Sequence, residues 1–107
     1  PENKSTAKDL ATLTSYVYKN HPNILEISRG NNFWHPDQKG KLLKFKNVNN
    51  FYYLPQFLGG KTGYLHEARE NIASVFNIKG KPVVIITLNS KNQQADTLAI
   101  IKILEKQ

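Results

Sequence analysis

The chain has 107 residues, no cysteine and a formal net charge of +7 at pH 7. This length allows one small domain with a modest core, and the absence of cysteine excludes disulfides and thiolate metal sites. The charge favours anionic partners such as nucleic acid, lipid head groups or acidic wall polymers, and no stretch has the ~18 apolar residues needed to cross a bilayer.

The first predicted element is an amphipathic helix that begins after Thr6 and ends near Asn20. Residues 6–9, Thr-Ala-Lys-Asp, have the form of a capping box. The helix should stop before Pro22, because the residue that precedes a proline avoids the helical region. The short apolar cluster at 24–27 fits either another helical turn or a packed loop. The apolar residues that recur at three- and four-residue spacing are Leu10, Leu13 and Val17.

Residues 29–40 have the composition of a loop, in which Phe33 and Trp34 are expected to anchor the chain onto the body. Between residues 41 and 48 the pattern changes to period two, which predicts a half-buried strand or ribbon. Its apolar face would carry Leu43 and Phe45, and its polar face Lys44 and Lys46.

Two aromatic and glycine-rich stretches follow. Asn49-Asn50 should turn the chain, and residues 51–58, interrupted by Pro55, predict a packed crossing and not a central strand. Gly59-Gly60 then opens a strand that carries Lys61-Thr62-Gly63.

The last third of the chain predicts a hairpin and a helix. Residues 71–78 and 82–88 flank Lys79-Gly80-Lys81, the clearest hairpin signal in the sequence. Residues 83–86 are apolar at every position, which is typical of a strand in the middle of a sheet covered on both faces. A final helix at 93–106 should lie on that sheet. We therefore predict an α+β fold over residues 1–107, with an antiparallel sheet flanked by an N-terminal and a C-terminal helix.

The segment Gly59-Gly60-Lys61-Thr62-Gly63-Tyr64 has the chemistry of a carboxylate-binding strand. Lys61 supplies a cation, Thr62 supplies a neutral donor beside it, and Gly63 lets a ligand lie against the backbone. Lys-Thr-Gly is also one of the three motifs of the penicillin-recognising serine enzymes, along with Ser-x-x-Lys and Ser-x-Asn.

In order and spacing, several segments together resemble the D-alanyl-D-alanine carboxypeptidases. The resemblance extends over nearly the whole chain and implies the last part of a β-lactamase/transpeptidase-like catalytic domain. The family's nucleophile helix and its Ser-x-Asn loop would lie before Pro1, so we expect a C-terminal fragment. The segments that carry the resemblance are residues 5–11, 47–49, 59–64, 67–68 and 72–74.

The resemblance implies specific roles for four residues. Lys61 and Thr62 would hold the terminal carboxylate of a D-alanyl-D-alanine stem peptide, which lies along the strand beside Gly63. The backbone N–H of Tyr64 would be half of an oxyanion hole, and the catalytic serine and its lysine would be absent from this chain. The chain departs from the family pattern at Leu65, commonly threonine, and at Arg69, commonly a small residue.

The implied partners are peptidoglycan stem peptides, β-lactams and the remaining N-terminal part of the same domain, and nucleic acid is not among them. The implied location is the cell envelope, outside the cytoplasm, with no cofactor and no bound metal. Removal of terminal D-alanine, cross-linking, endopeptidase action and β-lactam hydrolysis share the same motifs, so the reaction type stays open. An isolated fragment would expose a sheet edge and part of a face, and we expect it to associate with itself or with the missing part.

Two other segments match the serine motifs in form, and we interpret both as structural. Ser5 and Lys8 have Ser-x-x-Lys spacing, and Tyr18 and Asn20 match a variant of the middle motif. On one helix, however, Ser5 and Tyr18 would lie about 20 Å apart, too far to share a reacting centre. Ser5 or Thr6 is expected to cap the helix. Residues 90–92, Ser-Lys-Asn, follow Lys61 and are expected to form a loop that leads to the last helix.

A small basic nucleic-acid-binding module is the alternative function. Lysines and aromatic residues alternate along residues 39–53, as they do in some single-strand binders, although a solvated ribbon edge has the same pattern. His21, His35 and His66 have no spacing typical of a metal site. Glu67 and Glu70 are interpreted as solvated carboxylates.

Overall fold

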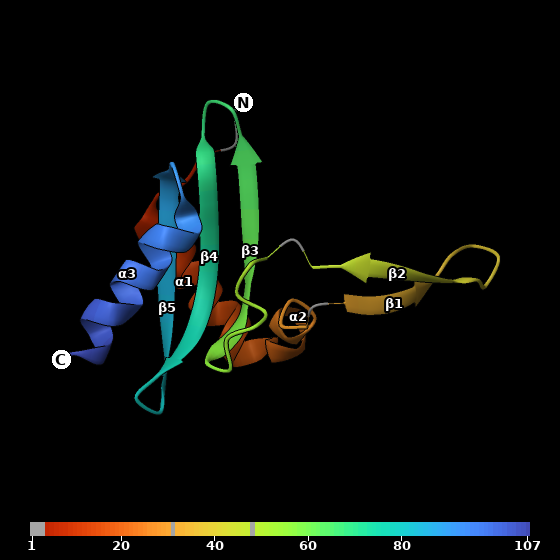
Figure 1. The fold of residues 1–107 in the computed structure, drawn as a ribbon, viewed down its shortest axis with the longest axis horizontal. Coiled ribbons are helices and arrows are strands. Elements are labelled where there is room, and N and C mark those ends of the chain that lie inside the picture. The colour runs from red at the N-terminus through yellow and green to blue at the C-terminus, as the bar shows by residue number, and fades with distance from the viewer. Residues whose placement is uncertain (1–3, 31, 48) are drawn as a thin grey trace.

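The computed structural model describes residues 4–30, 32–47 and 49–107, which form an α+β fold with three helices and five strands (Figure 1). This fold class agrees with the sequence prediction. In chain order the elements are α1 (Ala7–Asn20), α2 (Pro22–Glu26), β1 (Asn32–Pro36), β2 (Leu42–Lys46), β3 (Phe57–Leu65), β4 (Arg69–Ile78), β5 (Lys81–Ser90) and α3 (Gln93–Glu105).

The main sheet is antiparallel, with strand order β3-β4-β5. The predicted hairpin joins β4 to β5 through Lys79 and Gly80, which both have positive φ, as the tight turns that suit twisted strands require. Helices α1 and α3 pack on opposite faces of β4 and β5 (Figure 1). The sheet and its two flanking helices are therefore confirmed.

The core lies between the sheet and α3. Phe51, from the crossing that precedes β3, and Phe57, the first residue of β3, are buried together with Phe76 of β4. The rings of Phe51 and Phe76 meet edge to face, with their centroids 5.3 Å apart. The interpretation of residues 51–58 as a packed crossing is confirmed for residues 51–56, whereas residues 57 and 58 already belong to β3.

Helix α1 covers the opposite face of the sheet only in part. Thr6 caps the helix, because its Oγ1 accepts a hydrogen bond of 3.1 Å from the N–H of Asp9. Thr14 is buried, whereas Leu13, on the predicted apolar face, is 56% exposed. The cluster at 24–27 proves to be mostly the short helix α2, in which Leu25 is buried.

The β1–β2 hairpin differs from its sequence prediction. Residues 32–36 were expected to be loop and instead form β1, which pairs only with β2 among the described strands. Trp34 is 61% exposed and does not anchor the chain, and the side chain of Phe33 lies outside the described part of the structure. Leu43 and Phe45 of the predicted half-buried strand are both exposed, and Val48 is also outside the described residues. The period-two pattern correctly predicted a strand, but no other described helix or strand packs extensively on it.

The predicted central position of residues 83–86 is also wrong for the described sheet. β5 is an edge strand that pairs with β4 alone, although helices pack on both of its faces. No helix in the described part of the chain is long and apolar enough to span a membrane.

Candidate substrate-binding strand

The four residues of the predicted site, Lys61 to Tyr64, lie together on β3. This strand is an edge of the sheet, with β4 on one side and no second strand partner among the described residues. Such an edge leaves a row of backbone groups available to an extended ligand.

Hydrogen bonds identify the backbone groups that point away from β4. The N–H of Gly60 donates to Oγ of Ser28 at 2.8 Å, and the carbonyl of Thr62 accepts from Lys61 Nζ. Neither partner belongs to β4. Because successive residues of a strand point their backbone groups to alternate sides, the N–H of Tyr64 also points outward. The group that the resemblance assigns to the oxyanion hole is therefore on the open edge.

The side chains of this segment alternate between the two faces of the sheet. In the register, Lys61 and Gly63 lie opposite Ala73 and Asn71, and Thr62 lies opposite Ile72, a residue of the core beneath α3. Lys61 is therefore on the α1 face of the sheet. Thr62 is half-buried on the α3 face, which it shares with Tyr64, whose side chain is 67% exposed.

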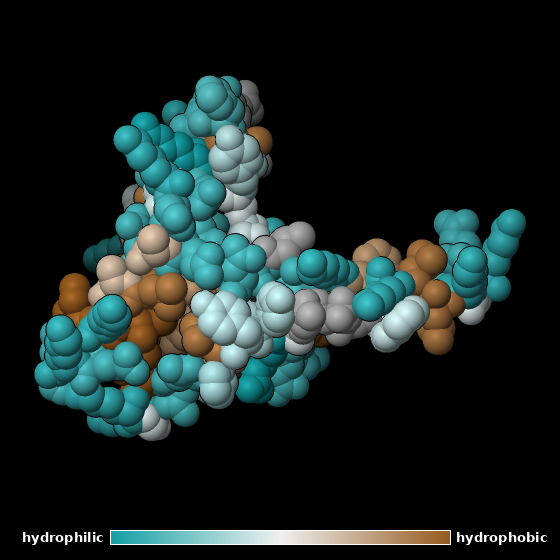
Figure 2. All heavy atoms as spheres, viewed as in Figure 1, coloured by the Kyte–Doolittle hydropathy of each residue, from teal (hydrophilic) through white to brown (hydrophobic). Residues whose placement is uncertain are grey.

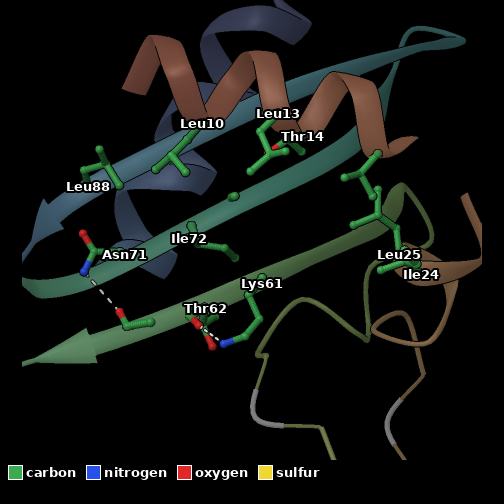
Figure 3. A pocket seen from close by; sticks show the side chains of 13 residues that line it. Leu10, Leu13, Thr14, Ile24, Leu25, Lys61, Thr62, Asn71, Ile72 and Leu88 are labelled. Atoms are coloured by element: carbon green, nitrogen blue, oxygen red, sulfur yellow. Dashed lines mark hydrogen bonds between the residues drawn. The ribbon is translucent and has the colours of Figure 1, made fainter. Parts of the chain in front are cut away.

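Lys61 lies at the rim of an apolar groove of about 390 Å³ between α1, α2 and the sheet (Figure 3). Its exposed ammonium group donates to the carbonyl of its neighbour Thr62. A ligand carboxylate could replace that carbonyl as the partner and would form a stronger, charge-assisted hydrogen bond. Apolar residues that line the groove include Leu10, Leu13, Val17, Ile24 and Leu25.

Glycine serves two different purposes on this strand. A Cβ on Gly59 would lie 2.5 Å from the carbonyl oxygen of Leu25, and Gly59 has a φ of +135°, so glycine is needed where β3 passes α2. A Cβ on Gly63 would meet nothing within 4 Å. The fold therefore does not require glycine at position 63, and the space beside it is open to a ligand.

The segments that resembled other serine motifs have structural roles. Ser5 is exposed and precedes the cap of α1, with its Oγ 3.4 Å from the carbonyl oxygen of Thr6. Ser90 Oγ donates to Asp96 at 2.5 Å, and Oδ1 of Asn92 caps α3 by accepting from the N–H of Ala95. The interpretation of residues 90–92 as the entry to the last helix is confirmed.

Sequence reasoning did not identify three polar residues that hold the site in place. Ser28 bonds Gly60 and the carbonyl of Leu25, which ties α2 to β3. Asn71 bonds the carbonyl of Gly63 and the N–H of Asn89, which links all three strands at this end of the sheet. Glu70, expected to be solvated, accepts from the N–H of Gln93 at 2.9 Å. Of these residues, only Asn71 had a signal in the sequence, because it is an asparagine within a predicted strand. An asparagine side chain can bond backbone groups in place of the hydrogen bonds between strands.

Comparison with solved structures shows the same fold in two bacterial enzymes. A mutant of the Streptomyces K15 DD-transpeptidase is 22% identical, with a TM-score of 0.76, and the match covers 96% of this chain and 43% of that one. A D-alanyl-D-alanine carboxypeptidase from Mycobacterium tuberculosis is 25% identical, with a TM-score of 0.72, and the match covers 92% of this chain and 40% of that one. The chain thus spans less than half the length of these solved proteins. No curated protein matches it.

The family comparison covers most of the sequence. The model of the family described as D-alanyl-D-alanine carboxypeptidase matches residues 1–92, which include α1, all five strands and the Lys-Thr-Gly segment. Residues 1–92 also include each of the segments that carried the resemblance in the sequence. The chain therefore belongs to the D-alanyl-D-alanine carboxypeptidase family.

Proposed function

We propose that this chain is the C-terminal part of the catalytic domain of a cell-envelope serine peptidase that removes terminal D-alanine from peptidoglycan stem peptides. The observation that supports this most is the open edge of β3, which combines the Lys61 ammonium group with an outward N–H at Tyr64. Membership of the family and the proposed substrate both support a cell-envelope location.

The stem peptide would bind as an added strand along β3. Main-chain hydrogen bonds to outward groups such as those of Thr62 would align it, and Gly63 would let its backbone approach closely. Lys61 and Thr62 would hold the terminal carboxylate. The N–H of Tyr64 would stabilise the oxyanion that forms when the scissile carbonyl is attacked.

Acyl transfer also needs groups that we propose lie in another part of the protein. A serine oxygen would form an ester with the penultimate D-alanine while the terminal D-alanine leaves with a proton, and water would then cleave the ester. Ser5 and Ser90 are unsuited to this role, because one precedes a helix cap and the other bonds Asp96. We therefore expect this chain alone to bind substrate weakly and to have no catalytic activity.

Two surfaces support a partner made of the remaining part of the domain. Helices pack on both faces of β5, and yet the strand pairs with β4 alone in the described sheet, which is unusual for a strand with four consecutive apolar residues at 83–86. The groove beside Lys61 is apolar and includes the exposed side chains of Leu13 and Ile24. We propose that the remaining part of the domain covers both and brings the nucleophile to the Lys61 side of β3.

The first prediction tests the binding strand directly. A peptide that ends in D-alanyl-D-alanine is titrated into the ¹⁵N-labelled chain, and amide chemical shifts are followed. We expect changes concentrated at Thr62 and Tyr64. Lys61→Ala should weaken binding roughly ten- to a hundredfold, because it removes a charge-assisted hydrogen bond worth about 1.5–3 kcal/mol.

The controls separate carboxylate recognition from general charge. Lys81→Ala removes another exposed lysine, at the start of β5, and should leave binding unchanged. The same peptide with a C-terminal amide should bind about as weakly as the acid binds to Lys61→Ala. Equal binding of the acid and the amide would show that Lys61 does not hold a carboxylate.

A further inference from the structure

We propose that the β1–β2 hairpin, here called the arm (residues 32–46), docks onto an anionic lipid surface. It combines exposed apolar side chains with lysines along a projecting element that no other part of the described structure covers. This inference goes beyond the proposed peptidase function and does not depend on the chemistry of β3.

The arm extends away from the body of the molecule (Figure 1). β1 and β2 pair with each other, and no other described helix or strand packs extensively on either. The base of the arm is fixed, because Nδ2 of Asn47 donates to the carbonyls of Ser28 and Gly30 at 2.6 and 2.7 Å. A two-stranded hairpin is only marginally stable alone in water. An exposed arm of this kind would therefore become more stable when it packs against another surface.

Apolar side chains lie along the arm on both of its faces. In the register Trp34 pairs with Lys44 and Pro36 pairs with Leu42 on one face, while Leu43 lies on the other. Trp34, Leu42 and Leu43 are all exposed, and Figure 2 shows the apolar residues of the arm next to hydrophilic ones. Lys44 Nζ lies 6.0 Å from the centroid of the Trp34 ring. The aromatic ring and the cation are therefore presented together.

The arm is strongly cationic. Its four lysines are Lys39, Lys41, Lys44 and Lys46, and its one acidic residue is Asp37. The carboxylate of Asp37 accepts the backbone N–H groups of Lys39 and Lys41 at 2.8 and 2.9 Å, so it shapes the tip of the hairpin. The lysine ammonium groups are left to face an external anion.

This combination fits a lipid interface better than a soluble polyanion. Tryptophan and lysine are the residues enriched where protein meets the lipid head groups, and aliphatic side chains gain free energy by entering the acyl boundary. A nucleic acid offers phosphates to the lysines and bases to Trp34, but it offers nothing to Leu42 and Leu43. A second copy of the arm would place its own four lysines opposite the four lysines of the first copy, and the like charges would repel each other.

Trp34 is the only tryptophan in the sequence, so its fluorescence reports on the arm alone. The full 107-residue chain is titrated with vesicles of phosphatidylglycerol and phosphatidylcholine in equal parts. We expect saturable binding with a blue shift of the Trp34 emission, weakened by added salt, and little binding to pure phosphatidylcholine.

Two variants with equal loss of charge make the test specific. Neutralising the arm by K39Q, K41Q, K44Q and K46Q should weaken vesicle binding by roughly several hundredfold, since each of the four lysines contributes roughly a factor of five. The control variant, K79Q, K81Q, K102Q and K106Q, has the same net charge and should bind almost as well as the parent chain. Circular dichroism checks that both variants are folded.

Three outcomes would overturn the proposal: vesicle binding without a Trp34 shift, equal weakening in both variants, or no binding to anionic vesicles. Tighter binding of a single-stranded oligonucleotide than of vesicles at the same salt concentration would also overturn it and assign the arm to nucleic acid. L42S combined with L43S gives an independent check, because it keeps every charge. It should reduce binding to vesicles and leave oligonucleotide binding unchanged.

Discussion

Ser5 and Thr6 are adjacent hydroxyl residues at the start of α1, and only one of them caps the helix. Oγ1 of Thr6 accepts from the N–H of Asp9, whereas Ser5 is exposed and points its hydroxyl toward the carbonyl of Thr6. The apparent Ser-x-x-Lys motif formed by Ser5 and Lys8 therefore begins just before a helix cap, and the hydrogen bond recorded for the Ser5 hydroxyl among the described residues goes to a backbone carbonyl and not to a general base.

These geometries predict different effects of two alanine substitutions. Thr6→Ala should lower the free energy of unfolding by about 1 kcal/mol, because it leaves the N–H of Asp9 without its partner, and Ser5→Ala should change it by less than about 0.5 kcal/mol. Urea denaturation of the 107-residue chain measures both. Incubation with a labelled penicillin should give no covalent adduct by mass spectrometry, and an adduct mapped to Ser5 would refute the structural interpretation of this residue.

At the residue scale, the sequence predicted local features well. The cap at Thr6, the turn at Gly80 and the placing of Lys61 to Tyr64 on one strand all depend on neighbours in the chain. Ser28 could not be predicted, because its hydrogen bond to Gly60 joins residues 32 positions apart. Long-range polar contacts of this kind depend on how α2 packs on β3, and no local pattern encodes them.

At the element scale, β3 illustrates how one strand meets two different demands. Near its start, Gly59 passes so close to Leu25 that a side chain would collide with the backbone of α2. Farther along, Gly63 has open space where a Cβ would be. The first glycine is required by the fold, and we propose that the second is kept small for the ligand.

Alanine substitutions should separate these two demands. Gly59→Ala should lower the free energy of unfolding by more than about 2 kcal/mol, because it combines a positive φ with a backbone collision. Gly63→Ala should change it by less than about 0.5 kcal/mol but should reduce the amide shift changes caused by the D-alanyl-D-alanine peptide. Equal peptide binding by Gly63→Ala and the parent chain would mean that the ligand does not lie against this residue.

Element type was easier to predict from the sequence than element environment. Period two correctly placed a strand at 42–46, but the same pattern suits a strand that packs on a body and one that pairs only within an arm. The apolar run at 83–86 correctly indicated cover on both faces, yet β5 is an edge in the described sheet. The hydrophobic pattern of a strand shows which of its faces suit a buried environment. Which segments actually contact the strand depends on the parts of the chain that are present.

At the scale of the whole molecule, the described structure has apolar surfaces that a stable monomer of this size usually covers. The groove beside Lys61 contains the exposed side chains of Leu13 and Ile24, each 56% exposed, and the edge of β5 is unpaired in the described sheet. Exposed apolar surface and open edges both favour association. Without the proposed remainder of the domain, a second copy of the chain is the molecule most readily available to bury these surfaces.

We therefore expect the isolated chain to self-associate in a concentration-dependent way, with light scattering giving a mass above that of the monomer. Leu13→Lys combined with Ile24→Lys should shift the chain toward the monomer, because it places two charges in the groove. Ile103→Lys is the matched control: this residue is also exposed and apolar, at 61%, but it lies on α3, on the other face of the sheet. Ile103→Lys should leave the association unchanged. A parent chain that stays monomeric at every concentration would argue against the groove as a surface that another part of the protein covers, and so against the fragment proposal itself.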